Sequence, residues 1–267
     1  ISTKIKKLRS KFKIYNIDGY VIPKNDSYFN EYSSPDRLKL ISNFDGSAGL
    51  AIILRNKNYL FVDGRYTIQA NYQSSNNFDV VEIHKKLPWK ILKHKIKIGY
   101  NPYCFTNLSL TRYFKNHFKL VPIYDDLISK NKSRRTNNKF YFIKDHVSGE
   151  SSKSKINRVL KYLRKDKSDS LFITAPENVA WLLNLRGKDN PYSPIPNSRL
   201  ILKNNGDIFL FANKSKTQGL SIKKTLFKIK VIDENKIDTF LKTFVSKKII
   251  LDRLSCSLAY KNILKIK

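Results

Sequence analysis

The sequence is poor in several residue types that mark particular classes of protein. It contains no methionine, two cysteines, and 21 acidic residues against 52 lysines and arginines. The widely separated Cys104 and Cys256 exclude a disulfide framework and fit a reducing cytoplasm. The longest apolar runs, such as residues 50–54, are far shorter than the roughly 20 residues of a membrane helix, and the basic N-terminus lacks the apolar core of a secretory signal. We therefore expect a cytoplasmic protein without a membrane partner, and Ile1 in place of Met suggests a trimmed or partial chain.

Motifs of catalytic and nucleotide sites are also missing. The sequence has no G-x-G-x-x-G, no Walker loop and no G-x-S-x-G. The two adjacent acidic pairs, at residues 125–126 and 233–234, precede expected helices, where the helix dipole favours acids. No two of the four histidines stand at the four-residue spacing of a helical metal site; they are His84, His94, His117 and His146. We therefore assign no catalytic residue and no metal ligand within the chain.

The excess of positive charge points toward nucleic acid at first sight. A net charge of +31 and a pI near 10.0 are typical of nucleic-acid binders. The lysines, however, are spread over the whole chain among Asn and Ile, which indicates a general compositional bias rather than a binding surface. The cluster from Lys130 to Arg135 is the exception, and phosphate binding stays open there. We do not expect nucleic acid as the main partner.

The length and the apolar pattern predict two domains. A chain of 267 residues with 41% hydrophobic and 12% aromatic residues has enough material for two packed cores. Residues 129–139 contain no apolar side chain and are interpreted as a basic linker. The expected domains are therefore residues 1–128 and 140–267.

Apolar periodicity predicts the same order of elements in both halves. The first half is expected to contain a helix over 3–16, a strand over 20–22, a helix capped by Ser34, a hairpin over 48–54 and 59–62, a helix over 66–72, strands at 79–83, 95–100 and 120–123, and a helix over 108–118. The second half is expected to contain a helix around 156–163, a strand at 171–173, a helix from Pro176, a hairpin over 200–202 and 208–211, strands at 229–232 and 249–251, and helices over 236–245 and from about 256.

The matching order predicts an α/β fold made of two copies of one domain, each a mixed β-sheet flanked by helices. In this alignment, residues 44–46 (Phe-Asp-Gly) fall where residues 185–187 (Leu-Arg-Gly) fall.

Two polar loops carry the candidate functional residues. Residues 63–66, Asp-Gly-Arg-Tyr, follow a buried strand and allow a tight turn into a helix with Arg and Tyr at its rim. Residues 184–197 combine three prolines, a glycine and an Arg/Asp pair, and stiff loops of this kind often bind ligands. The alternative is a loop that packs on its own domain, with its Arg bridging to its Asp.

Three motifs resemble one known enzyme family. Residues 43–49 (Asn-Phe-Asp-Gly-Ser-Ala-Gly), residues 61–66 (Phe-Val-Asp-Gly-Arg-Tyr) and residues 175–187 (Ala-Pro-Glu-Asn-Val-Ala-Trp-Leu-Leu-Asn-Leu-Arg-Gly) are similar to cytosolic Xaa-Pro aminopeptidase, or aminopeptidase P. This is the large three-domain type within the creatinase/prolidase "pita-bread" metallopeptidases. The resemblance runs from about residue 5 to the end.

The resemblance implies two creatinase-type N-terminal domains, without the C-terminal pita-bread domain that holds two divalent metals, typically manganese. We accordingly expect no cofactor in this portion and no peptidase activity from it alone. The implied partners are short peptides with proline second and, in the full-length protein, a second copy in a homodimer. Candidates for lining the substrate entrance are Arg65, Tyr66, Arg186 and Asp189. The alternative is a basic binding module or pseudo-enzyme scaffold that contacts nucleic acid or a protein partner.

Overall fold

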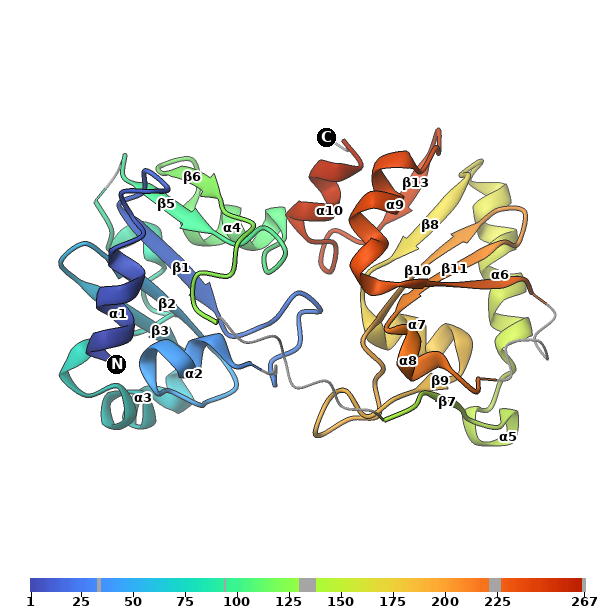
Figure 1. Cartoon of the computed structure of the whole chain (residues 1–267), viewed down its shortest axis with the longest axis horizontal. Helices are drawn as coiled ribbons and strands as arrows, with labels where there is room; N and C mark the ends of the chain where they lie inside the picture. The colour runs from blue at the N-terminus through green and yellow to red at the C-terminus, as the bar shows by residue number, and fades with distance from the viewer. Residues whose placement is uncertain (33–34, 94, 130–137, 221–226, 266–267) are drawn as a thin grey trace. The chain divides into compact units, whose positions relative to one another are not determined.

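The chain divides into two compact units. The computed structural model describes residues 1–267 except 33–34, 94, 130–137, 221–226 and 266–267. Unit 1 is Ile1–Arg134 and unit 2 is Arg135–Lys267, each with its own sheet (Figure 1). Most of the predicted linker 129–139, with its basic cluster, falls outside the described residues.

Unit 1 is a six-stranded mixed sheet with helices on its faces. Its elements are α1 (Ser2–Arg9), β1 (Gly19–Pro23), α2 (Arg37–Ser42), β2 (Gly49–Leu54), β3 (Asn58–Val62), η1 (Gly64–Tyr66), α3 (Thr67–Ser74), η2 (Ser75–Asn77), β4 (Asp79–Glu82), η3 (Pro88–Lys90), β5 (Lys97–Tyr100), α4 (Asn107–Phe114) and β6 (Lys119–Pro122), where η marks a 3-10 helix. The strand order is β4-β3-β2-β1-β5-β6. The pairs β1–β2 and β2–β3 are antiparallel and the other pairs are parallel.

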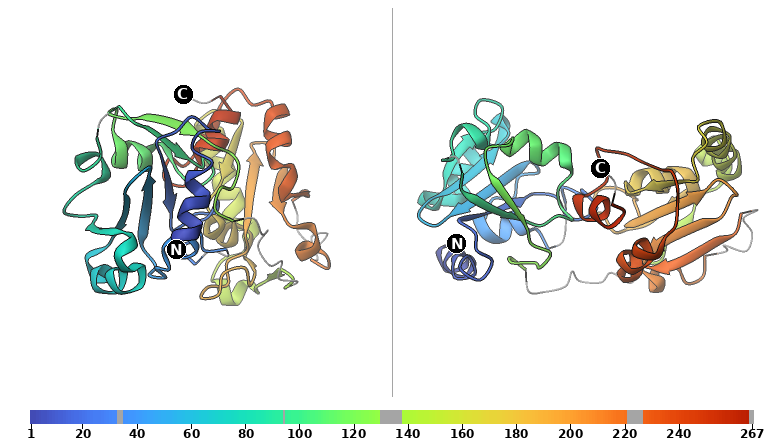
Figure 2. Two further views of the ribbon diagram at one scale, coloured as in Figure 1. Left: turned by 60° about the vertical axis from the view of Figure 1, so that its left-hand side comes forward. Right: turned by 90° about the horizontal axis from the view of Figure 1, so that it is seen from above.

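The core of unit 1 follows from the two-residue period of its strands. Tyr20 and Ile22 of β1 pack in the same cluster as Leu8 of α1. The alternate residue Val21 is also fully buried and faces the other side of the sheet, where α4 lies (Figure 2). The sheet is thus covered on both faces, which explains why its central strands are apolar without a break.

Three helix boundaries differ from their predictions. The helix expected over 3–16 spans only Ser2–Arg9, and turns follow it. The helix expected to be capped by Ser34, which is outside the described residues, begins at Arg37, because the Asp36 carboxylate accepts a hydrogen bond from the Lys39 amide at 3.0 Å. The helix expected over 108–118 ends at Phe114, because Lys115 takes a positive φ of 49°. The predicted strands and the hairpin of this half are confirmed.

Unit 2 repeats this plan with five strands in its main sheet. Its elements are β7 (Tyr141–Phe142), α5 (Asp145–Ser148), α6 (Ser152–Lys165), β8 (Ser170–Ile173), α7 (Pro176–Leu183), β9 (Leu185–Arg186), β10 (Ser198–Lys203), β11 (Ile208–Ala212), α8 (Lys214–Thr217), β12 (Ile229–Asp233), η5 (Glu234–Lys236), α9 (Ile237–Thr243), β13 (Ile249–Leu251) and α10 (Leu258–Ile263). The strand order is β12-β11-β10-β8-β13, and β7 pairs with β9 in a separate small sheet.

The two units share one topology, as predicted from the order of their elements. Strands β8, β10, β11, β12 and β13 pair with the same directions as β1, β2, β3, β4 and β5. Helices α2 and α7 both end at an asparagine in the left-handed region, Asn43 with φ 64° and Asn184 with φ 52°, a conformation that asparagine tolerates well. None of the described helices is long and apolar enough to cross a membrane.

Candidate functional site

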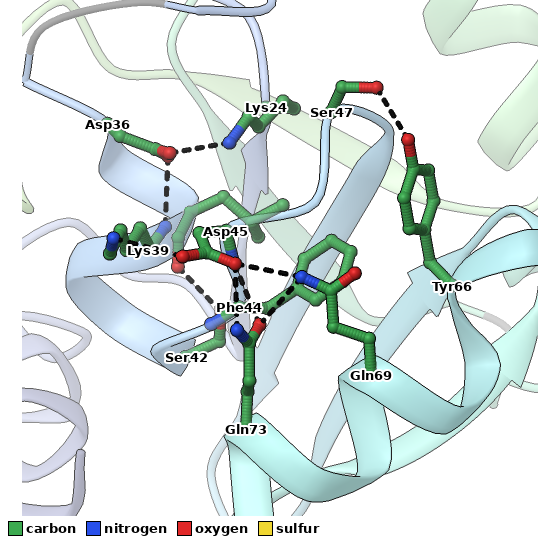
Figure 3. A network of polar contacts seen from close by, with 11 residues as sticks. Lys24, Asp36, Lys39, Ser42, Phe44, Asp45, Ser47, Tyr66, Gln69 and Gln73 are labelled. Atoms are coloured by element: carbon green, nitrogen blue, oxygen red, sulfur yellow. Dashed lines mark hydrogen bonds and ion pairs between the residues drawn. The ribbon is translucent and has the colours of Figure 1, made fainter.

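The first two motifs of unit 1 meet in one polar network (Figure 3). Asp45, in the loop after α2, accepts hydrogen bonds from the side-chain amides of Gln69 and Gln73 on α3, at 2.8 and 2.7 Å. The ammonium of Lys39 pairs with the other carboxylate oxygen at 3.1 Å. The bond from Gln73, followed by that from Lys39, lowers the pKa of Asp45. The network therefore ties residues 43–48 to α3.

Tyr66 joins the same loop from the second motif. Its hydroxyl lies 2.9 Å from the hydroxyl of Ser47, and its ring packs edge-on against buried Phe44 at 5.9 Å between centroids. A Cβ on Gly46 would come within 2.3 Å of the Phe44 ring, so this position needs glycine. Tyr66 thus holds the loop in place, and its place at the substrate entrance stays a prediction.

Arg65 is the candidate that projects into solvent. Its side chain is 74% exposed and its Nε donates to the Asp63 carboxylate at 2.8 Å. The same carboxylate accepts from the Arg65 amide at 3.0 Å, and His84 Nε2 lies 3.3 Å away. The Arg65 side chain, followed by its amide, lowers the pKa of Asp63 to about 2. Beside these groups is a hollow of about 180 Å³, lined also by Arg112 and Tyr113.

Arg186 and Asp189 lie in one loop of unit 2 but have different partners. Arg186 Nη1 donates to the carbonyls of Ala180 and Leu185, both at 2.9 Å, and so closes the end of α7. The side chain of Asp189 is 2% exposed and forms an ion pair with Lys216. Among the described residues Arg186 and Asp189 form no ion pair with each other, so the Arg–Asp bridge of the alternative interpretation is wrong.

Sequence reasoning missed two lysines that shape unit 2. Lys216 is one, and its distance from Asp189 along the chain gave no local signal. Lys155 is the other: it is 2% exposed, and its ammonium donates to the Trp181 carbonyl at 2.9 Å and to Asn184 Oδ1 at 2.7 Å. Burial lowers the pKa of Lys155. Lys155 lies four residues before apolar Val159, so a helical wheel would have placed it on the apolar side of this helix.

The described residues offer structural charge pairs rather than a metal centre. No group of three or more His, Cys, Asp and Glu side chains that could hold a metal ion occurs among them. Cys104 and Cys256 are both free and buried, and burial raises the pKa of Cys256 to about 11. A thiol with a raised pKa is a poor nucleophile at neutral pH.

Comparisons with known proteins agree with this two-unit organisation. Residues 4–127 and residues 131–267 each match a family described as the creatinase/prolidase N-terminal domain. A protein of Coprinopsis cinerea named probable Xaa-Pro aminopeptidase P is 33% identical over 213 residues, which cover 73% of this chain and 34% of the relative. Xaa-Pro aminopeptidase 1 of Dictyostelium discoideum is 27% identical over 252 residues, which cover 81% and 38%.

A solved structure has the same fold over nearly the whole chain. It is an X-prolyl aminopeptidase from Caenorhabditis elegans, described as a cytosolic enzyme with a di-nuclear active site. The TM-score is 0.84 at 23% identity, over 98% of this chain and 48% of that one. The chain therefore spans about a third of the length of the curated relatives it matches and about half of this structure.

Proposed function

Because the chain belongs to the creatinase/prolidase family, with an N-terminal-type domain in each unit, we propose that it is the noncatalytic N-terminal portion of a metal-dependent Xaa-Pro aminopeptidase. The enzyme would remove an N-terminal residue that precedes proline. The observation that supports this most strongly is that relatives named Xaa-Pro aminopeptidase P match over 73% of this chain, while the matched segment covers only 34% of their own length.

We place the metal chemistry outside these two domains. By resemblance the reaction uses two divalent metal ions, which we expect to be manganese. Such a pair would act as a Lewis acid that activates water. The described residues do not fit such a pair, because they contain no cluster of suitable ligands. The two units instead shape substrate access and assembly, in a cytoplasmic enzyme that we expect to be a homodimer at full length.

Arg65 is the best-placed substrate contact of unit 1. Its guanidinium is exposed, and a guanidinium pairs well with the carboxylate of a short peptide. In the full-length enzyme, Arg65→Ala should lower kcat/KM on tripeptides with proline second, and the matched variant Arg55→Ala, which removes another exposed Arg–Asp pair of unit 1, should not. An unchanged kcat/KM for Arg65→Ala on several substrates would remove Arg65 from the substrate entrance.

The isolated chain tests the noncatalytic assignment directly. Purified and supplied with manganese, it should release no N-terminal residue from Ala-Pro-Ala above the rate of a buffer blank. Release that a chelator abolishes would show that this portion is catalytic after all.

A second candidate function is a basic binding module. Every ionisable side chain of α6 other than Tyr162 is basic, and all but Lys155 of these basic side chains are exposed. Such a helix face favours a polyanion, with nucleic acid as the test case. Binding should then fall steeply with salt, and no binding at low salt would eliminate this candidate.

A further inference from the structure

The loop formed by residues 187–197 (the 187–197 loop) is fixed at its base by buried charge. The Asp189 side chain is 2% exposed and its ion-pair partner Lys216 is 12% exposed. The second carboxylate oxygen of Asp189 accepts a hydrogen bond from the Asn197 amide at 2.7 Å. Asp189 therefore connects the start of the loop, the end of the loop and α8.

The partner lysine is itself held by the backbone around it. The carbonyl of Lys216 accepts a hydrogen bond from the Phe140 amide at 2.8 Å. The ring of Phe140 in turn fills the space beside Gly187, where an added Cβ would meet it at 2.9 Å. Lys216 is thus connected to both ends of the loop. It reaches Asn197 through Asp189 and Gly187 through Phe140.

The far end of the loop is a stiff turn with an exposed aromatic ring. The Tyr192 amide donates to Asn190 Oδ1 at 3.1 Å, and Asn190 pairs with Ser193 as an antiparallel bridge. Prolines at 191 and 194 restrict the backbone on either side. The side chain of Tyr192 is nevertheless 77% exposed, and the burial of a tyrosine ring against a ligand is favourable.

We propose that Lys216 is a positioning residue, which through its ion pair with Asp189 presents Tyr192 at the tip of the 187–197 loop to the peptide substrate. This inference rests on the proposed aminopeptidase function. A preorganised loop loses little conformational entropy when it binds, and a tyrosine ring packs well on the ring of proline, as aromatic grooves do with proline-rich segments. Asp189 is accordingly a structural anchor and not a substrate ligand.

The test uses the complete gene product that contains this chain, assayed with Ala-Pro-Ala. Lys216→Met and Tyr192→Ala should each raise KM about tenfold and change kcat less than about twofold, because each removes binding rather than chemistry. Lys216→Arg, which keeps the cation, should bring KM back to within about threefold of the wild type. The control is Lys248→Met, which removes an exposed ion pair of unit 2 with Asp166 and should leave both constants unchanged.

A hydrogen-exchange measurement separates positioning from general stability. In Lys216→Met the exchange rates of the amides in the 187–197 loop should rise more, relative to the wild type, than those of β10 and β11, whose protection falls only with the global stability of unit 2. An unchanged KM in Lys216→Met despite faster loop exchange would overturn the proposal, and so would an unchanged KM in Tyr192→Ala. If the wild-type gene product cleaves no Xaa-Pro peptide at all, the proposed function itself has failed, and the positioning role falls with it.

Discussion

Units 1 and 2 share a fold but hold equivalent loops in opposite ways. Both loops follow a helix that ends at a left-handed asparagine, Asn43 or Asn184. In unit 1 the loop is held by Asp45, whose side chain is 39% exposed and bonds to Lys39 and two glutamines. In unit 2 the corresponding loop is longer and is held by Asp189, which is almost fully buried against Lys216. The same topology therefore supports one weakly and one strongly anchored loop.

One tryptophan in each unit allows the stabilities of the two units to be measured separately. Trp89 lies in unit 1 and Trp181 in unit 2, and the sequence has no other tryptophan. Trp89→Phe leaves a reporter of unit 2, and Trp181→Phe leaves a reporter of unit 1. Urea unfolding followed by tryptophan fluorescence then gives a free energy of unfolding for each unit in the intact chain.

The largest expected effect is in unit 2. Lys216→Met leaves the buried Asp189 carboxylate without its cation, and breaking a buried ion pair in this way costs about 3–5 kcal/mol. The matched change in unit 1, Lys39→Met, should cost less than about 1 kcal/mol, because its partner is exposed. Equal losses in the two units would contradict the difference in anchoring.

Lys155→Met should have the next largest effect and again in unit 2. The substitution leaves the Trp181 carbonyl and Asn184 Oδ1 without their donor, and unsatisfied buried groups cost about 1–3 kcal/mol. Because burial lowers the pKa of Lys155, its charged form is penalised in the folded state. The wild type should therefore gain stability relative to Lys155→Met as pH rises through the lowered folded pKa toward the ordinary value, as paired urea titrations would show. A pH-independent difference would contradict this.

In unit 1, Tyr66→Phe should cost about 1 kcal/mol, the usual contribution of one hydrogen bond. The ring contact with Phe44 remains, and the loss is confined to the bond with Ser47. Ser47→Ala should show the same loss, and the double variant should lose no more than either single variant. Additive losses would mean that the two hydroxyls do not act as a pair.

The smallest effect concerns pH and the exposed carboxylate of Asp45. Its pKa in the folded state is lowered, so its stabilisation of unit 1 is present above the ordinary pKa near 3.8 and is lost as pH falls through the folded value. Asp45→Asn should cost less than about 1 kcal/mol at pH 7. The difference from wild type should shrink as the pH is lowered below 4. A difference that grows in acid would contradict the assignment.

Local patterns predicted most of the fold and little of the anchoring. The hairpins and the helix that begins at Pro176 formed where predicted, because their apolar period and start signals lie within a few residues. The pair Asp189–Lys216 spans 27 residues and the contact Lys155–Asn184 spans 29. Both depend on how helices dock in the folded unit, which no local spacing encodes. The sequence motif identified both Arg65 and Tyr66 as candidates. Only the folded structure shows that Arg65 is exposed while Tyr66 holds a loop.

The most direct test of the proposed function is a paired peptidase assay. The 267-residue chain alone and the complete gene product are each incubated with manganese and with Ala-Pro-Ala or Ala-Ala-Ala, and release of the N-terminal alanine is measured. We predict release by the complete product from Ala-Pro-Ala alone, and none by the 267-residue chain from either peptide. Chelator-sensitive release by the 267-residue chain, or a complete product that cleaves neither peptide, would contradict the proposal.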